Sequence, residues 1–274
     1  MHLSPRHPRY ASLRVRARLA RAHRQGLVVA EGLIAQGRGE AFDYLLGERT
    51  SPSARRAERV AADWLLAARH PVVSVNGNVA ALAAAEVSAL ARAVPGLLVE
   101  VNLFHRTGPR ARAVARVLEA AGVRNVRGVR PTATIPGLPS DRARVDRRGI
   151  LRADVCLVPL EDGDRAEALR ALGKRVISVD LNPLSRTSRA ADLPIVDELQ
   201  RALRGITAAA RRRRATGRSG QWTPFDRRAA LADALATIAQ GLNRAAARRP
   251  IARRQRRASR PRSPGTGGRS RRTP

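Results

Sequence analysis

The chain has 274 residues and a hydrophobic fraction of 43%, enough for one large domain or two small ones with a filled core. Aromatic residues make up only 3%, so we expect a core of Val, Leu, Ile and Ala. A formal net charge of +31 would ordinarily point to nucleic acid, but Lys174 is the only lysine among 53 basic residues, and residues 248–274 contain no acid. We attribute most of the charge to the arginine bias of a GC-rich genome and to a basic tail. A polyanion-binding surface is kept as an alternative.

Other classes of protein have little support in the sequence. Cys156 is the only cysteine, which excludes a disulfide framework and a cysteine-based metal site. His7 and His105 lack the spacing of metal ligands, so no metal site is predicted from protein side chains. The N-terminus has no apolar segment of signal-peptide length, and no apolar run reaches about 18 residues. We therefore expect a cytoplasmic protein without a membrane span.

The first 70 residues read as helical. The apolar spacing predicts a basic amphipathic helix, a second helix that Gly37-Arg38-Gly39 breaks, a short helical piece and a further amphipathic helix with Ser51 as cap and Pro52 near its start. These segments are expected at 11–25, 28–36, 41–48 and 52–69.

From residue 72 the pattern changes to alternating strands and helices. Apolar, β-branched runs predict strands at 72–75, 97–103, 125–129, 154–159, 175–179 and 194–196. The segments between and after them predict helices at 79–93, 109–121, 164–172, 197–214 and 226–247, with a long Pro- and Gly-rich loop at 130–150 that is typical of a functional or mobile segment. This alternation predicts an α/β fold with a parallel sheet that helices cover on both faces.

Four of the predicted strands end in polar residues. In open parallel sheets, ligands bind beyond the carboxyl ends of the strands. These ends together favour a polar ligand site at one edge of the sheet. They comprise Asn76-Gly77-Asn78, Asn102 with His105-Arg106, Glu161-Asp162-Gly163-Asp164-Arg165, and Asp180, Asn182, Ser185 and Arg186.

Each group also has a simpler explanation. Asn76 and Asn78 could form a turn and a helix cap. The acids at 161–164 could bind Mg²⁺, although an acidic helix start is commoner. Arg38 could be a solvated loop residue, but glycine on both sides suits a close approach to phosphate.

Several familiar motifs are missing from the sequence. It contains no G-x-x-x-x-G-K-[ST], no G-x-G-x-x-G opening a helix after a strand, and no G-x-S-x-G. The residues alone thus lead to an α/β enzyme that handles a phosphorylated or nucleotide ligand, with no catalytic residue identified.

Long, uncommon strings in the sequence resemble one family, the archaeal-type 4-phosphopantoate–β-alanine ligases, also called phosphopantothenate synthetases. The resemblance runs in order from about residue 5 to 200. Its strings are His7-Pro8-Arg9-Tyr10, GLIAQGRGEAFDYLLGERT (32–50), VSVNGNVAAL (73–82), PLEDGDRAEAL (159–169) and VDLNPLSRTSRAAD (179–192).

The resemblance implies a homodimeric, Rossmann-like ligase of coenzyme A biosynthesis. Such an enzyme joins 4-phosphopantoate to β-alanine with ATP and Mg²⁺ through an acyl adenylate, releasing AMP and diphosphate. It implies one ligase domain over 1–247, divided into a helical part (1–70), a Rossmann-like core (71–215) and a C-terminal helix (216–247). Residues 248–274 are expected to be a disordered tail.

The resemblance also assigns ATP contacts. Arg16 and Arg38 would contact the phosphates. Asp180, Leu181 and Asn182 would hold the nucleoside, followed by Arg186 and Thr187 on the same loop. The family's next nucleotide contact is expected just after residue 197, where its pattern suggests Asn. This chain has Glu198 followed by Leu199. The change is tolerable if backbone groups make the contact, but it puts adenine binding in doubt if the Asn side chain does. Asn76 and Asn78 are expected on the phosphopantoate side from their position alone.

Two other functions are kept as alternatives. A nucleic-acid-binding protein would use the Arg-rich tail, and its binding would depend strongly on salt. A Rossmann-type oxidoreductase would bind a nicotinamide cofactor.

Overall fold

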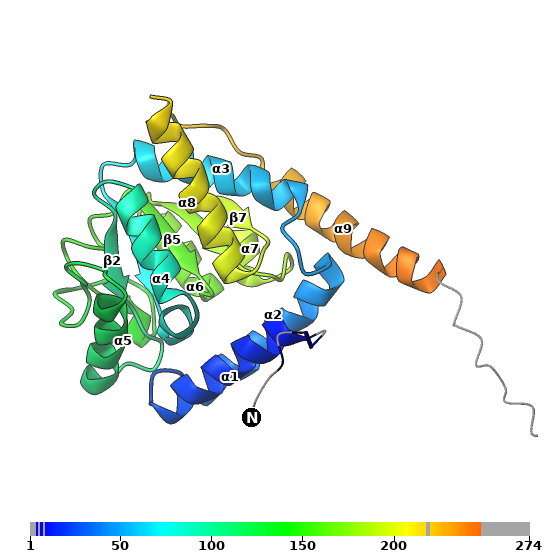
Figure 1. Ribbon diagram of the computed structural model, residues 1–274. Helices are drawn as coiled ribbons and strands as arrows, with labels where there is room; N and C mark the ends of the chain where they lie inside the picture. The colour runs from blue at the N-terminus through cyan, green and yellow to red at the C-terminus, as the bar shows by residue number, and fades with distance from the viewer. Residues whose placement is uncertain (1–3, 5, 8, 218–219, 248–274) are drawn as a thin grey trace, which may run out of the picture.

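The computed structural model describes residues 4, 6–7, 9–217 and 220–247, so the tail 248–274 lies outside the described residues. Five parallel strands form the central sheet in the order β2-β1-β5-β6-β7 (Figure 1). They are β1 (Pro71–Val75), β2 (Leu98–Val101), β5 (Val155–Pro159), β6 (Arg175–Val179) and β7 (Leu193–Ile195). The predicted parallel α/β fold is confirmed.

The strand residues of this sheet are buried on both sides because helices cover both of its faces. Val73, Leu157 and Ile177 join a core with α3 (Pro52–Ala67), α4 (Gly77–Ala93), α5 (Gly108–Ala120) and α8 (Leu199–Ala215). Val72 and Cys156 join a second core on the other face, with α6 (Gly163–Ala171) and α7 (Arg186–Ala190). The β-branched and aliphatic residues of the strands therefore pack against helices on both faces of the sheet.

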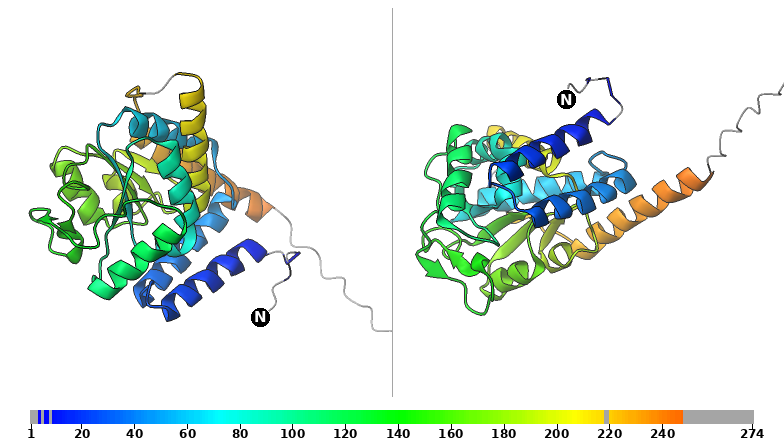
Figure 2. Two further views of the ribbon diagram at one scale, coloured as in Figure 1. Left: turned by 60° about the vertical axis from the view of Figure 1, so that its left-hand side comes forward. Right: turned by 90° about the horizontal axis from the view of Figure 1, so that it is seen from below.

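Three helices complete the described structure. The first two, α1 (Tyr10–Arg24) and α2 (Ala30–Leu46), lie side by side (Figure 2). The last, α9 (Arg227–Ala247), packs against α2, α3 and β7 and extends beyond the body of the molecule (Figure 1). None of the helices in the described ranges is long and apolar enough to cross a membrane.

The predicted break at Gly37-Arg38-Gly39 is wrong, because α2 is continuous from Ala30 to Leu46. A glycine in a helix interior costs only about 1 kcal/mol, and packing against neighbouring elements outweighs that cost. The helix ends instead at Gly47, whose φ of 88° is left-handed.

The predicted strand at 125–129 is also wrong. Only one bridge, between Glu100 and Arg127, joins this segment to β2. Asn125 and Gly128 have φ values of 55° and 79°, which turn the chain away from a strand. A Cβ on Gly128 would lie 2.3 Å from the Val101 carbonyl oxygen, so the segment crosses close to the β2 backbone.

The loop predicted at 130–150 contains short elements of its own. These are β3 (Ala133–Thr134), a 3-10 helix η1 (Asp141–Ala143) and β4 (Arg144–Val145), with β3 and β4 antiparallel. Buried Glu100 anchors the segment, since its carboxyl oxygens accept the N–H groups of Asp146 (2.8 Å) and Ile150 (2.7 Å). Burial raises the pKa of Glu100 to about 7. This anchoring brings η1 to the edge of the sheet.

Candidate ligand site at the carboxyl edge of the sheet

Helix α2 crosses the carboxyl edge of the sheet and contacts it at two places, which form the two ends of the candidate site. Near its start, the Gly32 carbonyl accepts a hydrogen bond of 2.8 Å from Asn78, just after β1. Seven residues later, a Cβ on Gly39 would lie 3.7 Å from the Leu181 side chain, just after β6. Seven helical residues span about 10 Å, which matches the two strand spacings between β1 and β6. We call these the β1 end and the β6 end.

At the β6 end, Asp180 and Asn182 form a compact turn. The Asp180 N–H donates to the Ile195 carbonyl (3.1 Å), and the Asp180 Oδ1 accepts the Asn182 N–H (2.9 Å). Burial raises the pKa of Asp180, while hydrogen bonds from Ser185 and Asn182 and the charge of Arg38 act in the opposite direction. The structure therefore places Arg38 and Asp180 at the same end of the candidate site within one chain.

Arg16 is engaged elsewhere on the same side. Its guanidinium forms a two-point ion pair with Glu40 of α2, at 2.9 and 3.0 Å. This hydrogen bond raises the pKa of Arg16. Tyr44 donates a further hydrogen bond to Glu40 (2.5 Å). Arg38, by contrast, is exposed on α2 and forms no ion pair among the described residues.

Arg186 and Thr187 begin α7, whose N-terminus Ser185 caps by accepting the Ser188 N–H (3.0 Å). The buried Thr187 hydroxyl donates to the Glu161 carbonyl (2.5 Å), so that side chain is already satisfied. Arg186 lies on the surface and pairs with Asp164 (2.5 Å) and, more weakly, Glu167 (3.7 Å). The sequence reading missed α7 because five helical residues show no periodicity.

Glu198 acts as the N-cap of α8. Its carboxylate accepts the N–H groups of Gln200 and Arg201, both at 3.0 Å, and burial raises its pKa. Leu199 is buried. Both side chains are therefore turned into the protein, and a ligand at this position would meet backbone groups.

Asn76 and Asn78 have structural partners at the β1 end. Asn76 caps α4 by accepting the Val79 N–H (3.0 Å) and donates to the carbonyls of Pro159 (3.3 Å) and Leu160 (2.8 Å). It thus joins the ends of β1 and β5, where the direction of the strand connections reverses. Asn78 holds α2 through Gly32. The capping explanation of Asn76 is confirmed.

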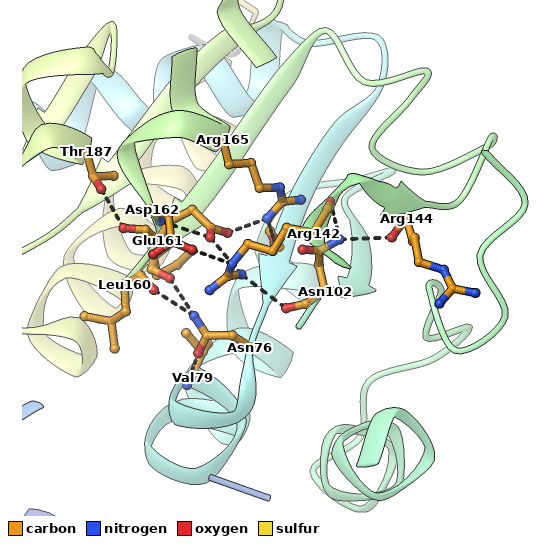
Figure 3. A network of polar contacts seen from close by, with 12 residues as sticks. Asn76, Val79, Asn102, Arg142, Arg144, Leu160, Glu161, Asp162, Arg165 and Thr187 are labelled. Atoms are coloured by element: carbon orange, nitrogen blue, oxygen red, sulfur yellow. Dashed lines mark hydrogen bonds and ion pairs between the residues drawn. The ribbon is translucent and has the colours of Figure 1, made fainter. Parts of the chain in front are cut away.

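A buried ion-pair network, which the sequence reading missed, fills the space beside this junction (Figure 3). Glu161 lies between two arginines: Arg142 of η1, 2.7 Å away, and Arg165 of α6. The second nitrogen contact of Arg142 is to Asp162 (2.7 Å), and Arg165 also donates to Ser74 of β1 (2.9 Å). Arg165 is fully buried. Glu161 therefore forms buried ion pairs, while Asp162 and Asp164 give α6 the acidic start that was expected.

The only sequence signals for this network were indirect. Arg142 falls in the long segment expected to be functional, and Arg165 in the motif that follows β5. Neither position shows that both side chains converge on one carboxylate, because that depends on how the 130–150 segment folds over the sheet.

The described residues do not form a protein-built metal site. No group of three His, Cys, Asp or Glu side chains within them lies close enough to hold an ion. Cys156 is buried in the core, which raises the pKa of its thiol to about 12 and makes it unreactive.

Comparison with known proteins identifies the family. The profile of the phosphopantothenate/pantothenate synthetase family matches residues 53–241. A 4-phosphopantoate–β-alanine ligase of Methanospirillum hungatei is 56% identical over 200 residues, covering 73% of this chain and 81% of the relative. The ligase of Methanosarcina mazei is 48% identical, and the match covers 88% of this chain and 96% of the relative. The ligase of Thermococcus onnurineus is 53% identical, and the match covers 75% of this chain and 78% of the relative. The chain therefore belongs to the phosphopantothenate/pantothenate synthetase family, a family of ligases.

Proposed function

We propose that this chain joins 4-phosphopantoate to β-alanine in an ATP-dependent reaction that passes through an acyl adenylate. Family membership carries the proposal, since relatives named 4-phosphopantoate–β-alanine ligase match 73–88% of the chain. The two-ended edge of the sheet supports it, because a ligation that uses a nucleotide needs adjacent sites for two different substrates.

The β6 end suits the nucleotide. The Asp180 carboxylate is an acceptor for ribose hydroxyls, and the exposed guanidinium of Arg38 is free to meet phosphate oxygens. Contacts at Leu181, Thr187 and at Glu198-Leu199 would use backbone groups, because those side chains are buried or already bonded. Asn182 and Arg186 lie on the rim of the same loop.

The reaction requires two displacements. A carboxylate oxygen of 4-phosphopantoate bonds to the α-phosphorus of ATP, and the bond from that phosphorus to diphosphate breaks. The β-alanine nitrogen, after losing a proton, bonds to the acyl carbon, and the bond to AMP breaks. The chain contributes positioning and positive charge, which are the main sources of catalysis when charge moves between phosphate oxygens.

Arg16 would contribute only after rearrangement. Its ion pair with Glu40 is exposed on the arginine side, so exchange of Glu40 for a triphosphate costs little. We propose that Arg16 joins Arg38 on the phosphates when ATP binds.

Magnesium would enter with the nucleotide. The donor set in the described residues does not build a resident site, and Mg²⁺ is commonly held by substrate phosphates, water and one or two carboxylates.

We further propose a homodimer. Exposed apolar side chains on the adjacent helices α2 and α9 support it, including Ile34 (70% exposed) and Leu242 (51% exposed). Light scattering should give twice the chain mass, and Ile34→Glu should lower that mass if this surface is the interface. A monomer for the parent chain would contradict the proposal.

The reaction is tested by product analysis with each substrate omitted in turn. AMP should form only when ATP, 4-phosphopantoate and β-alanine are all present. Arg38→Ala should reduce kcat/KM for ATP about ten- to a hundredfold, since a charge-assisted hydrogen bond contributes about 1.5–3 kcal/mol. ADP as the nucleotide product would contradict the adenylate route.

A further inference from the structure

Arg110 of α5 is a half-buried cation at the β1 end. Its Nε donates to the Leu27 carbonyl (3.2 Å) and its Nη1 to the His105 carbonyl (2.5 Å). It forms no ion pair within the described part of the chain. Burial lowers the pKa of Arg110 and the charge of Arg142 lowers it further, while the charge of Glu31 acts in the opposite direction.

The start of α4 adds positive potential at the same place. A Cβ on Gly77 would lie 2.1 Å from the Leu27 carbonyl oxygen and 3.0 Å from the Arg110 Nη2, so the carbonyl and the guanidinium that it accepts from both pack on the first residue of this 17-residue helix. Asn76 caps only the Val79 N–H, and the described residues offer no acceptor to the N–H groups of Gly77 and Asn78. Free N–H groups at a helix start bind anions.

Arg142 supplies a second directed donor. Its side chain is only 7% exposed, its Nε and Nη1 face Asp162 and Glu161, and its Nη2 has no hydrogen-bond partner among the described residues. Figure 3 shows this guanidinium between Glu161 and Asn102, next to the loop that Asn76 contacts. The two acids fix the orientation of this guanidinium, and we infer that its remaining nitrogen is the one available to a ligand.

We propose that Arg110, Arg142 and the N–H groups of Gly77 and Asn78 bind the phosphate group of 4-phosphopantoate. This inference rests on the proposed function and adds the residues that recognise its phosphorylated substrate. A phosphate carries a charge of about −1.5 to −2 and three acceptor oxygens, which match two guanidiniums and a helix start.

The geometry of α2 separates this phosphate from those of ATP. Arg38 and Asp180 lie at the β6 end, about 10 Å along the edge. A 4-phosphopantoate with its phosphate at the β1 end would extend its carboxylate along the edge toward the nucleotide, which is the direction that adenylation needs.

Steady-state kinetics tests the assignment. Arg110→Ala should raise KM for 4-phosphopantoate ten- to a hundredfold and leave KM for ATP within about twofold, as expected for loss of one charge-assisted contact. Arg116→Ala removes an exposed arginine from the same helix and serves as the matched control, with unchanged constants. An increase confined to ATP, or none at all, would overturn the assignment.

Direct binding separates this inference from the proposed function. Isothermal titration without ATP should show that the parent chain binds 4-phosphopantoate at least tenfold more tightly than pantoate, and that Arg110→Ala abolishes the difference. Arg110→Gln retains a donor toward Leu27 without the charge and should behave in the same way, which guards against misfolding of the alanine variant. Equal affinity of the parent for both ligands would overturn the phosphate site, whereas a lack of product in the ligase assay would overturn only the function.

Discussion

Glu58 of α3, a helix that packs against β7, allows a test of the electrostatics on this side of the sheet. Its side chain is buried, and its Oε1 has no hydrogen-bond partner among the described residues. It faces Asp197, whose oxygens already accept hydrogen bonds from Thr50 (2.6 Å) and Arg201 (3.0 Å). Arg201 in turn pairs with Asp43 of α2. Glu58 is thus a buried acid beside a carboxylate that is already paired.

Burial, the adjacent Asp197 charge and a hydrogen bond to Asp197 raise the pKa of Glu58 to about 8, despite the opposing charges of Arg55 and Arg59. In the unfolded chain the value is near 4.5. The folded state therefore holds a proton that the unfolded state releases between about pH 4.5 and 8, and stability falls as pH rises through this window. The upper limit is about 1.4 kcal/mol per pH unit, or about 3 kcal/mol between pH 5.5 and 7.5.

Glu58→Gln replaces the protonated carboxyl with a neutral group of the same shape and should remove this dependence. Urea unfolding at pH 5.5, 6.5 and 7.5 should show the variant gaining up to about 3 kcal/mol relative to the parent as pH rises. Glu119→Gln, at an exposed acid of α5, should follow the parent at every pH. Parallel curves for the parent and Glu58→Gln would show that Glu58 does not hold the extra proton in the folded state.

Three further substitutions test the fold and the site. Gly37→Ala should stabilise the chain by about 0.5–1 kcal/mol, because Gly37 is helical with open space around it, and unchanged or lower stability would contradict a continuous α2. Gly32→Ala should lower the urea midpoint instead, since its Cβ would lie 2.4 Å from the Asn78 Oδ1. Glu161→Ala should lower the free energy of unfolding by about 3–5 kcal/mol, because it strands two buried guanidiniums; a calorimetric Tm within one degree of the parent would count against the network.

The sheet was predictable because its signals are local. Apolar runs such as Val176–Val179 mark buried strands, and polar residues after them mark the carboxyl edge. Cap chemistry was equally readable, as at Ser51, whose hydroxyl accepts the Ala54 N–H (3.0 Å). Local signals failed where tertiary packing overrides them. The glycines at 37 and 39 predicted a break in the helix, but packing of α2 on its neighbours keeps them helical.

The residues that shape the site were predictable only in part. Positions such as Asp180 follow a strand directly, so their place at the edge could be deduced. Arg142 and Arg110 depend instead on tertiary arrangement, because each comes from a segment that is remote in sequence from the acids and helix start that it approaches. The spacing of residues along the chain does not predict such long-range contacts.

Transfer of oxygen from the substrate carboxylate to AMP distinguishes an acyl adenylate from every other route. The reaction is run with 4-phosphopantoate labelled with ¹⁸O in its carboxylate, and the nucleotide product is examined by mass spectrometry. Because the carboxylate oxygen bonds to the α-phosphorus and stays there when the amine displaces AMP, one ¹⁸O should appear in AMP. Label in inorganic phosphate together with ADP, or unlabelled AMP, would contradict the acyl-adenylate route.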